Sequence, residues 1–223
     1  MGLKAPSPKA GQRKSEMDYK YTTTFESVLL ACEINESSLI SKASLETLSP
    51  LLPKDIDYEG NIDLLGVAFN AAVVNKFNKN GDGMDTATAV KYTNNFIHKP
   101  TNIEHDKQKV VGHIASAGYS EFGSNKLLTE AEVSNIKNPF NIALGAVLYK
   151  TVNPHFTELV EKSIDPEDGA YQKVSASWEV GFNDYVLAVG SDILSEARIV
   201  DNPEEIEELQ GHLRSYGGSG KTD

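Results

Sequence analysis

The alternation of apolar and polar side chains is clearest at residues 173–182. The apolar residues there occupy every second position: Val174, Ala176, Trp178, Val180 and Phe182. Because successive side chains of a strand point to opposite faces, this pattern predicts a strand that turns its apolar residues to a core. Ser175 and Ser177 then share the opposite face. Shorter apolar stretches predict further strands at residues 62–69, 71–74, 109–119, 126–134, 142–151, 184–190 and 193–200.

Helical spacing is strongest at residues 153–164. Asn153 can cap the helix and Pro154 suits its first position, while an apolar stripe follows at Phe156, Leu159, Val160 and Ile164. Similar but weaker patterns predict helices at 37–48, at 86–98 and in the acidic segment after Asn202. Residues 21–34 fit a strand or a helix equally well. Asn80 and the two glycines of residues 80–83 predict a tight turn.

These elements divide the chain into four parts. Residues 1–20 carry five basic side chains and little apolar surface, which indicates a flexible basic arm. Residues 21–60 form an N-terminal extension that is partly helical, and residues 61–200 form the core domain. Residues 201–223 consist of an acidic helix and a flexible, glycine-rich tail.

Charge and cysteine content narrow the classes of partner. The net charge of −11 repels phosphates and anionic lipids, so we expect neither nucleic acid nor a membrane as a partner. No apolar stretch approaches the ~20 residues that span a bilayer, and the first residues lack the apolar core of a secretion signal. The single cysteine, Cys32, forms no internal disulfide, which indicates a reducing compartment. Its apolar neighbours make it a poor nucleophile.

The remaining candidates for chemistry are histidines and serines. The chain has five histidines but no compact metal-binding signature. A metal site built from His98, His105 and His113 stays open as an alternative. His105 lies between Glu104 and Asp106, whose carboxylates can orient an imidazole that acts as a general base. On local sequence alone, His105 and Ser175 also fit ordinary exposed surface residues.

Three segments in order resemble the prohead maturation proteases of tailed phages. Residues 66–75, Gly-Val-Ala-Phe-Asn-Ala-Ala-Val-Val-Asn, resemble an N-terminal strand block of the prohead core proteases of T-even-type phages. Glu104-His105-Asp106, followed by Val111-Gly112, resembles the histidine motif of the wider family. Lys173-Val174-Ser175-Ala176-Ser177 resembles its serine motif. The resemblance covers roughly residues 60–200.

The resemblance implies an α+β fold like that of herpesvirus assemblin, with a mostly antiparallel β-barrel core and surrounding helices. It implies a serine endopeptidase without a cofactor, in which His105 is the general base and Ser175, directly after Val174, is the nucleophile. Ser177 stays a candidate because it lies on the same strand face. The third catalytic group is open among Asp106, Glu104, His98 and His113, and we favour Asp106.

The same resemblance implies where such an enzyme acts. Its substrates would be the scaffold or core proteins and the major capsid protein, inside the viral prohead in the host cytoplasm, and its relatives form dimers. Ile34-Asn35-Glu36 and Ile206-Glu207-Glu208 resemble cleavage sites, which predicts self-trimming. Three other functions stay open: an inactive capsid or scaffold component of the same fold, a metal-dependent hydrolase, and a β-rich binding domain.

Overall fold

A computed structural model of the chain describes residues 19–28, 47–78, 80–165 and 167–220. The main sheet is antiparallel, with the order β2 (Leu64–Val74), β6 (Phe140–Tyr149), β4 (Val110–Glu121) and β3 (Pro100–Asn102). The short β5 (Leu127–Leu128) pairs with β4. A separate ribbon joins β1 (Tyr21–Val28) to β7 (Ser175–Phe182), and a small hairpin joins β8 (Leu187–Val189) to β9 (Arg198–Val200).

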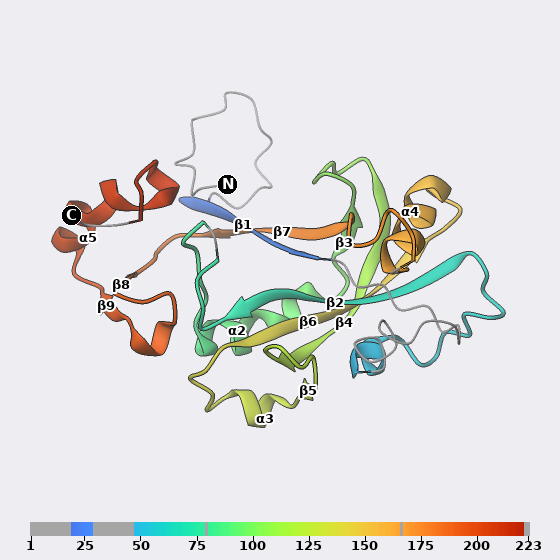
Figure 1. Cartoon of the computed structure of the whole chain (residues 1–223), viewed down its shortest axis with the longest axis horizontal. Coiled ribbons are helices and arrows are strands. Elements are labelled where there is room, and N and C mark those ends of the chain that lie inside the picture. Colours follow the sequence, from blue (N-terminus) through green and yellow to red (C-terminus); the bar gives the residue numbers. More distant parts are fainter. Residues whose placement is uncertain (1–18, 29–46, 79, 166, 221–223) are drawn as a thin grey trace.

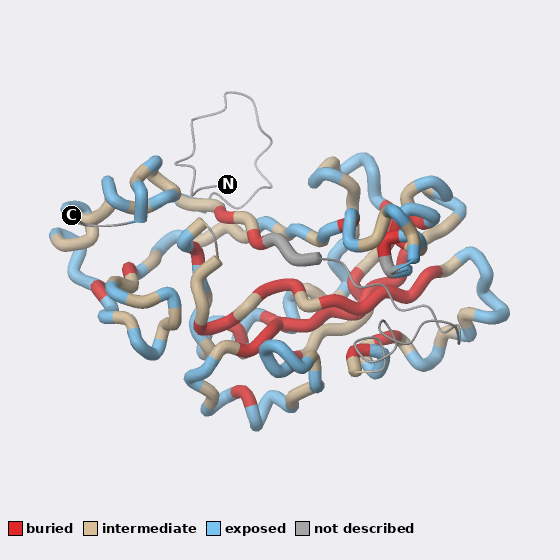
Figure 2. The backbone as a smooth tube through the Cα atoms, in the orientation of Figure 1, coloured by how far each residue is buried: buried red, intermediate tan, exposed pale blue. Residues whose placement is uncertain are grey.

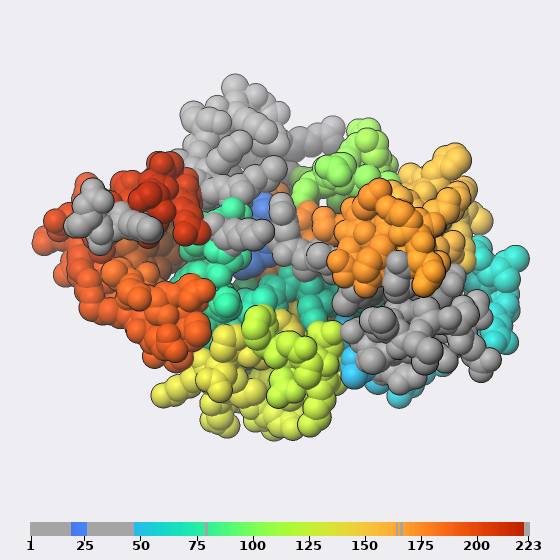
Figure 3. Space-filling model, viewed as in Figure 1, coloured from blue at the N-terminus to red at the C-terminus, as the bar shows by residue number. Residues whose placement is uncertain are grey.

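Four α-helices in the described residues accompany these strands: α2 (Thr86–Tyr92), α3 (Glu130–Val133), α4 (Pro154–Ile164) and α5 (Pro203–Leu209). Short 3-10 turns lie at η1 (Ser49–Leu51), η2 (Thr93–Phe96), η3 (Leu194–Glu196), η4 (Gln210–His212) and η5 (Arg214–Tyr216). The last strands and helices gather at one end of the molecule (Figures 1 and 3).

The core lies on both faces of β6, which is buried along nearly its whole length (Figure 2). One face packs into a large cluster that includes Phe69, Phe140 and Leu144. The other face meets a smaller cluster around Leu48 and Leu52. The backbone of η1 approaches β6 so closely that Gly145 leaves no room for a side chain. A strand covered on both faces reads as a continuous apolar run, and residues 142–148 do so.

The prediction of a β-barrel core is wrong. In the described residues β2 pairs only with β6, and β3 pairs only with β4, so the main sheet stays open. Closure would require backbone pairing between an edge of this sheet and the β1–β7 ribbon. The ribbon instead lies over the sheet and contacts it through side chains (Figure 1). The fold is α+β with antiparallel sheets, as expected, but without a barrel.

Several element predictions are confirmed and others need correction. The strands near 109–119 and 142–151 and the helix at 153–164 are present as β4, β6 and α4. The segment 126–134, predicted as one strand, is β5 followed by α3, because Thr129 and Glu132 form a capping box that starts a helix. The helix predicted at 86–98 becomes a 3-10 turn after residue 92.

The N-terminal and C-terminal predictions differ in outcome. The basic arm lies outside the described residues, apart from its last two positions, and most of the helix predicted at 37–48 does too. Residues 21–28 are strand β1. The acidic helix is present as α5, and Asn202 caps it by accepting hydrogen bonds from the amides of Glu204 and Glu205. The tail, expected to be flexible, folds back through backbone hydrogen bonds from Gly218 and Gly220 to residues 213 and 212.

Candidate active site

Strand β7 presents the predicted serines to solvent. Ser175, Ser177 and Glu179 are exposed, whereas Ala176 and Trp178 pack against the main core cluster. This confirms the two faces predicted from the alternating pattern. The partner of β7 is β1, a strand of the N-terminal extension, and their register places the backbone of Glu26 opposite Ser177. The serine strand is therefore held by a segment far from it in sequence.

Trp178 fixes the β1–β7 ribbon to the main sheet. Its ring stacks on Phe25, the residue opposite it on β1, with centroids 4.7 Å apart, and meets Phe96 edge-on at the same distance. The indole N–H donates to the carbonyl of Ala71 over 3.1 Å. Ala71 is the extra residue of a β-bulge in β2 and has no partner in β6. Because Ala71 has no strand partner, its carbonyl can accept the indole N–H, and this bond orients Trp178, the residue that follows Ser177.

His105 lies at the tip of the loop between β3 and β4. Both Glu104 and His105 have positive φ, at 54° and 56°, and the amide of Asp106 donates to the carbonyl of Ile103 over 3.0 Å. Positive φ at both central residues is the requirement of a type I′ turn, which usually takes asparagine and glycine. Such a conformation costs a residue with a Cβ of the order of 1 kcal/mol or more. Glutamate is therefore unfavourable here for the backbone alone, whereas histidine adopts positive φ more often than most residues.

The structure brings His105 together with Ser177. The Nε2 atom of His105 lies 2.7 Å from the Oγ of Ser177, a hydrogen-bond distance. Both side chains are exposed. If Nε2 carries no proton, the Ser177 hydroxyl donates to it, which is the arrangement that a general base needs. The two residues are 72 positions apart in sequence, so the fold alone creates this pair.

Ser175 lies on the same face of β7, two residues from Ser177. Two residues of a strand span about 6.6 Å, so one imidazole does not bond both hydroxyls from a single position. In the described part of the chain, the serine that lies at hydrogen-bond distance from the His105 ring is Ser177 and not Ser175. Of the two serines that the sequence left open, this geometry favours Ser177 as the partner of His105.

Two candidates for a third catalytic group, Asp106 and His113, bond other groups than the His105 ring. Asp106 bonds the amide of Gln108 and the ammonium group of Lys109 rather than the imidazole. These contacts, the amide bond first, lower the pKa of Asp106. His113 bonds the Tyr149 hydroxyl through Nδ1 over 2.8 Å. Within the described ranges, Ser177 is the only side chain that hydrogen-bonds the His105 ring.

Other chemistry finds little support in the described residues. No group of three histidine, cysteine, aspartate or glutamate side chains there is arranged to hold a metal ion, so His98, His105 and His113 do not form such a cluster. None of the helices described is long and apolar enough to cross a bilayer. Cys32 and the proposed cleavage site at residues 34–36 lie outside the described residues, whereas residues 206–208 belong to helix α5.

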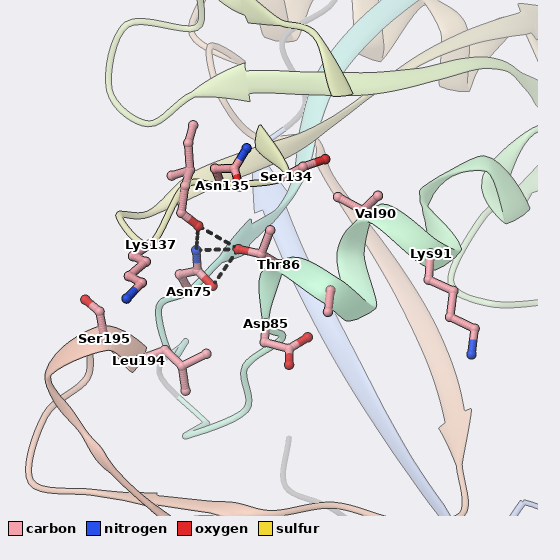
Figure 4. A pocket seen from close by; sticks show the side chains of 12 residues that line it. Asn75, Asp85, Thr86, Val90, Lys91, Ser134, Asn135, Lys137, Leu194 and Ser195 are labelled. Carbon is pink, nitrogen blue, oxygen red and sulfur yellow. Dashed lines mark hydrogen bonds between the residues drawn. The ribbon is translucent and has the colours of Figure 1, made fainter. Parts of the chain in front are cut away.

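A separate open groove of about 700 Å³ lies between α2, the segment after α3, and η3 (Figure 4). At its base the buried Asn75 amide donates to the Thr86 hydroxyl over 2.9 Å and to the Ile136 carbonyl over 3.3 Å. Lys91 and Lys137 line its sides. The lining residues include neither His105 nor Ser177, so this groove does not contain the His105–Ser177 pair.

Comparisons with known proteins identify no relative. No family model, no curated protein sequence and no solved structure matches this chain.

Proposed function

We propose that this protein is a serine endopeptidase in which Ser177 is the nucleophile and His105 the general base. The observation that carries the proposal is the 2.7 Å contact between Nε2 of His105 and Oγ of Ser177. The strained turn at Glu104 and His105 supports it, because unfavourable backbone conformations concentrate at functional sites. The resemblance of the segments around both residues to prohead proteases gives the reaction class.

The reaction proceeds by acyl transfer. His105 takes the proton of the Ser177 hydroxyl while its oxygen attacks the carbonyl carbon of a peptide bond. The bond from that carbon to nitrogen then breaks, and the amine leaves with the proton from His105. Water, deprotonated by His105, attacks the resulting ester and restores the free hydroxyl as the acid product departs. Each step balances without a metal or an oxidant.

The setting proposed for this activity is the immature phage capsid. Scaffold or core proteins, the major capsid protein and the protease itself would be the substrates. This part of the proposal rests on the sequence resemblance. The exposure of both side chains supports a polypeptide substrate, because a folded or extended chain can reach them from solvent.

The test exploits the two neighbouring serines. Wild type, Ser177→Ala and Ser175→Ala are reacted with a fluorophosphonate, which labels activated serines, and are co-expressed with the capsid and scaffold proteins of the same genome. Intact mass locates the label and the cleavage products. We expect Ser177→Ala to lose at least about 10³-fold in rate, because the nucleophile and its base act as a unit. Ser175→Ala, the matched control on the same face, should stay within about twofold of wild type.

Each result has a definite meaning. Loss of activity in Ser175→Ala with retention in Ser177→Ala would transfer the nucleophile to Ser175. Equal activity in both variants, or no labelling and no cleavage by wild type inside assembled proheads, would refute a serine protease.

The second candidate is an inactive capsid or scaffold component. One observation favours it: in the described residues no group orients the His105 ring from the side opposite Ser177. The same experiment decides between the two, because an inactive component neither labels nor cleaves.

A further inference from the structure

Asp106 makes four contacts with three residues of the loop that carries His105. Its Oδ1 accepts a hydrogen bond from the Gln108 amide over 2.9 Å, and its Oδ2 lies 3.2 Å from the Lys109 ammonium nitrogen. Its own amide donates to the Ile103 carbonyl over 3.0 Å, and its carbonyl accepts from the Lys109 amide over 2.9 Å. The side chain and backbone of one residue therefore join two consecutive turns.

These two turns control the direction of His105. The first turn, residues 103–106, contains the two positive-φ residues and is unfavourable for its own sequence. The second turn begins at Asp106, whose side chain imitates a backbone carbonyl by accepting the amide two residues on. The amide of Ile103 donates to the carbonyl of Lys109 over 3.2 Å, which closes the loop onto β3 and β4. The second turn therefore holds the first one in place.

We infer that Asp106 is a positioning residue, which keeps His105 against Ser177 through its acceptor oxygen rather than by placing a negative charge on the imidazole. The inference rests on the proposed function of Ser177 and His105. It differs from a charge-partner role in one chemical respect. An asparagine at position 106 retains an oxygen that accepts the Gln108 amide but carries no charge, whereas an alanine retains neither.

The experiment compares Asp106→Asn with Asp106→Ala. The rate at which a fluorophosphonate labels Ser177 is measured for each variant from pH 5 to 9. Asp106→Ala should lose about 10- to 100-fold, because small displacements of a catalytic group have effects of that order. Asp106→Asn should stay within about threefold of wild type, with the same pH midpoint, because the orienting hydrogen bond is kept and no charge faced the ring.

A second readout follows the loop without activity. Hydrogen exchange of the Gln108 amide should accelerate in Asp106→Ala and stay slow in Asp106→Asn. Asp57→Ala is the matched control, because exposed Asp57 accepts the amides of Glu59 and Gly60 in the same manner, away from the described pair. It should change neither the labelling rate nor the exchange at Gln108.

The outcomes separate this inference from the proposed function. Equal damage from Asp106→Asn and Asp106→Ala, with a shifted pH midpoint, would make Asp106 a charge partner and overturn the inference. A fully reactive Asp106→Ala would overturn it as well. An unreactive wild type would overturn the proposed function first, and the inference with it.

Discussion

Replacing Trp178 with phenylalanine removes the one polar contact that its side chain makes with the main sheet in the described residues. The variant keeps an aromatic ring between Phe25 and Phe96 but lacks the indole N–H that donates to the Ala71 carbonyl. That carbonyl belongs to the unpaired residue of a bulge, so no strand partner replaces the lost donor. The variant therefore isolates the hydrogen bond from the packing.

The magnitude follows from the three contacts. A hydrogen bond contributes about 1 kcal/mol net, and leaving its acceptor unpaired costs about 1–3 kcal/mol. We expect Trp178→Phe to lower the free energy of unfolding by about 1–2 kcal/mol. Trp178→Ala removes both aromatic contacts as well. Replacing a buried tryptophan with alanine typically lowers the free energy of unfolding by about 3–5 kcal/mol. Because Trp178 is only half-buried, we expect Trp178→Ala to lower it by about 3 kcal/mol.

Urea denaturation followed by circular dichroism measures these values, since the protein has a single tryptophan and the variants lose it. Tyr92→Phe, at an exposed aromatic residue, is the control and should change stability by less than about 0.5 kcal/mol. Trp178→Phe should also slow fluorophosphonate labelling of the adjacent Ser177. A Trp178→Phe protein within about 0.5 kcal/mol of wild type would show that the bond to Ala71 does not hold the ribbon.

Two other positions give sharp predictions. Burial raises the pKa of Asp82, and the hydrogen bond from Thr23 partly offsets this rise. Ionisation of Asp82 therefore lowers the free energy of unfolding at pH values above its folded-state pKa, and has no such effect at pH values below the ordinary pKa of an aspartate. Asp82→Asn should therefore raise the melting temperature at pH 7, and this gain should vanish below pH 4; a gain that is the same at both pH values would contradict it. Glu104→Asn should raise the free energy of unfolding by about 0.5–1 kcal/mol, because asparagine tolerates positive φ. Glu167→Asn, at an exposed residue with ordinary φ, is the control and should give no such gain. Equal effects of the two substitutions in urea titrations would count against strain at Glu104.

Long periodic segments were predictable from sequence, because their periodicity records which face meets the core. Strand β7 and helix α4 are examples: Ala176 and Trp178 of β7 and Phe156 and Val160 of α4 pack in the core as predicted, whereas Leu159 of the predicted helical stripe is exposed. The bulge at Ala71 was not predictable in this way. The sequence suggested two strand-like stretches on either side of Asn70, and the structure joins them into one strand with an extra residue.

The barrel prediction failed for a different reason. Sequence patterns specify which residues of a strand face a core, but backbone pairing between distant strands depends on the twist and register of the assembled sheet. The partner of β7 illustrates this limit. Residues 21–34 fitted either secondary structure, yet residues 21–28 form the strand that pairs with β7.

One property of the site could be predicted from the sequence and another could not. The exposure of both serines followed from the alternating pattern, whereas the choice between Ser175 and Ser177 depends on where the loop of His105 ends in space. The type I′ turn at the tip of that loop was not predictable, because Glu104 and His105 are not the asparagine and glycine that such a turn usually takes. The departure from turn preferences at Glu104 fits a turn that is kept for the side chain it displays rather than for its own stability. The Glu104 and Asp106 variants test the two parts of that argument separately, because the first relieves the strain and the second removes the residue that holds the strained turn in place.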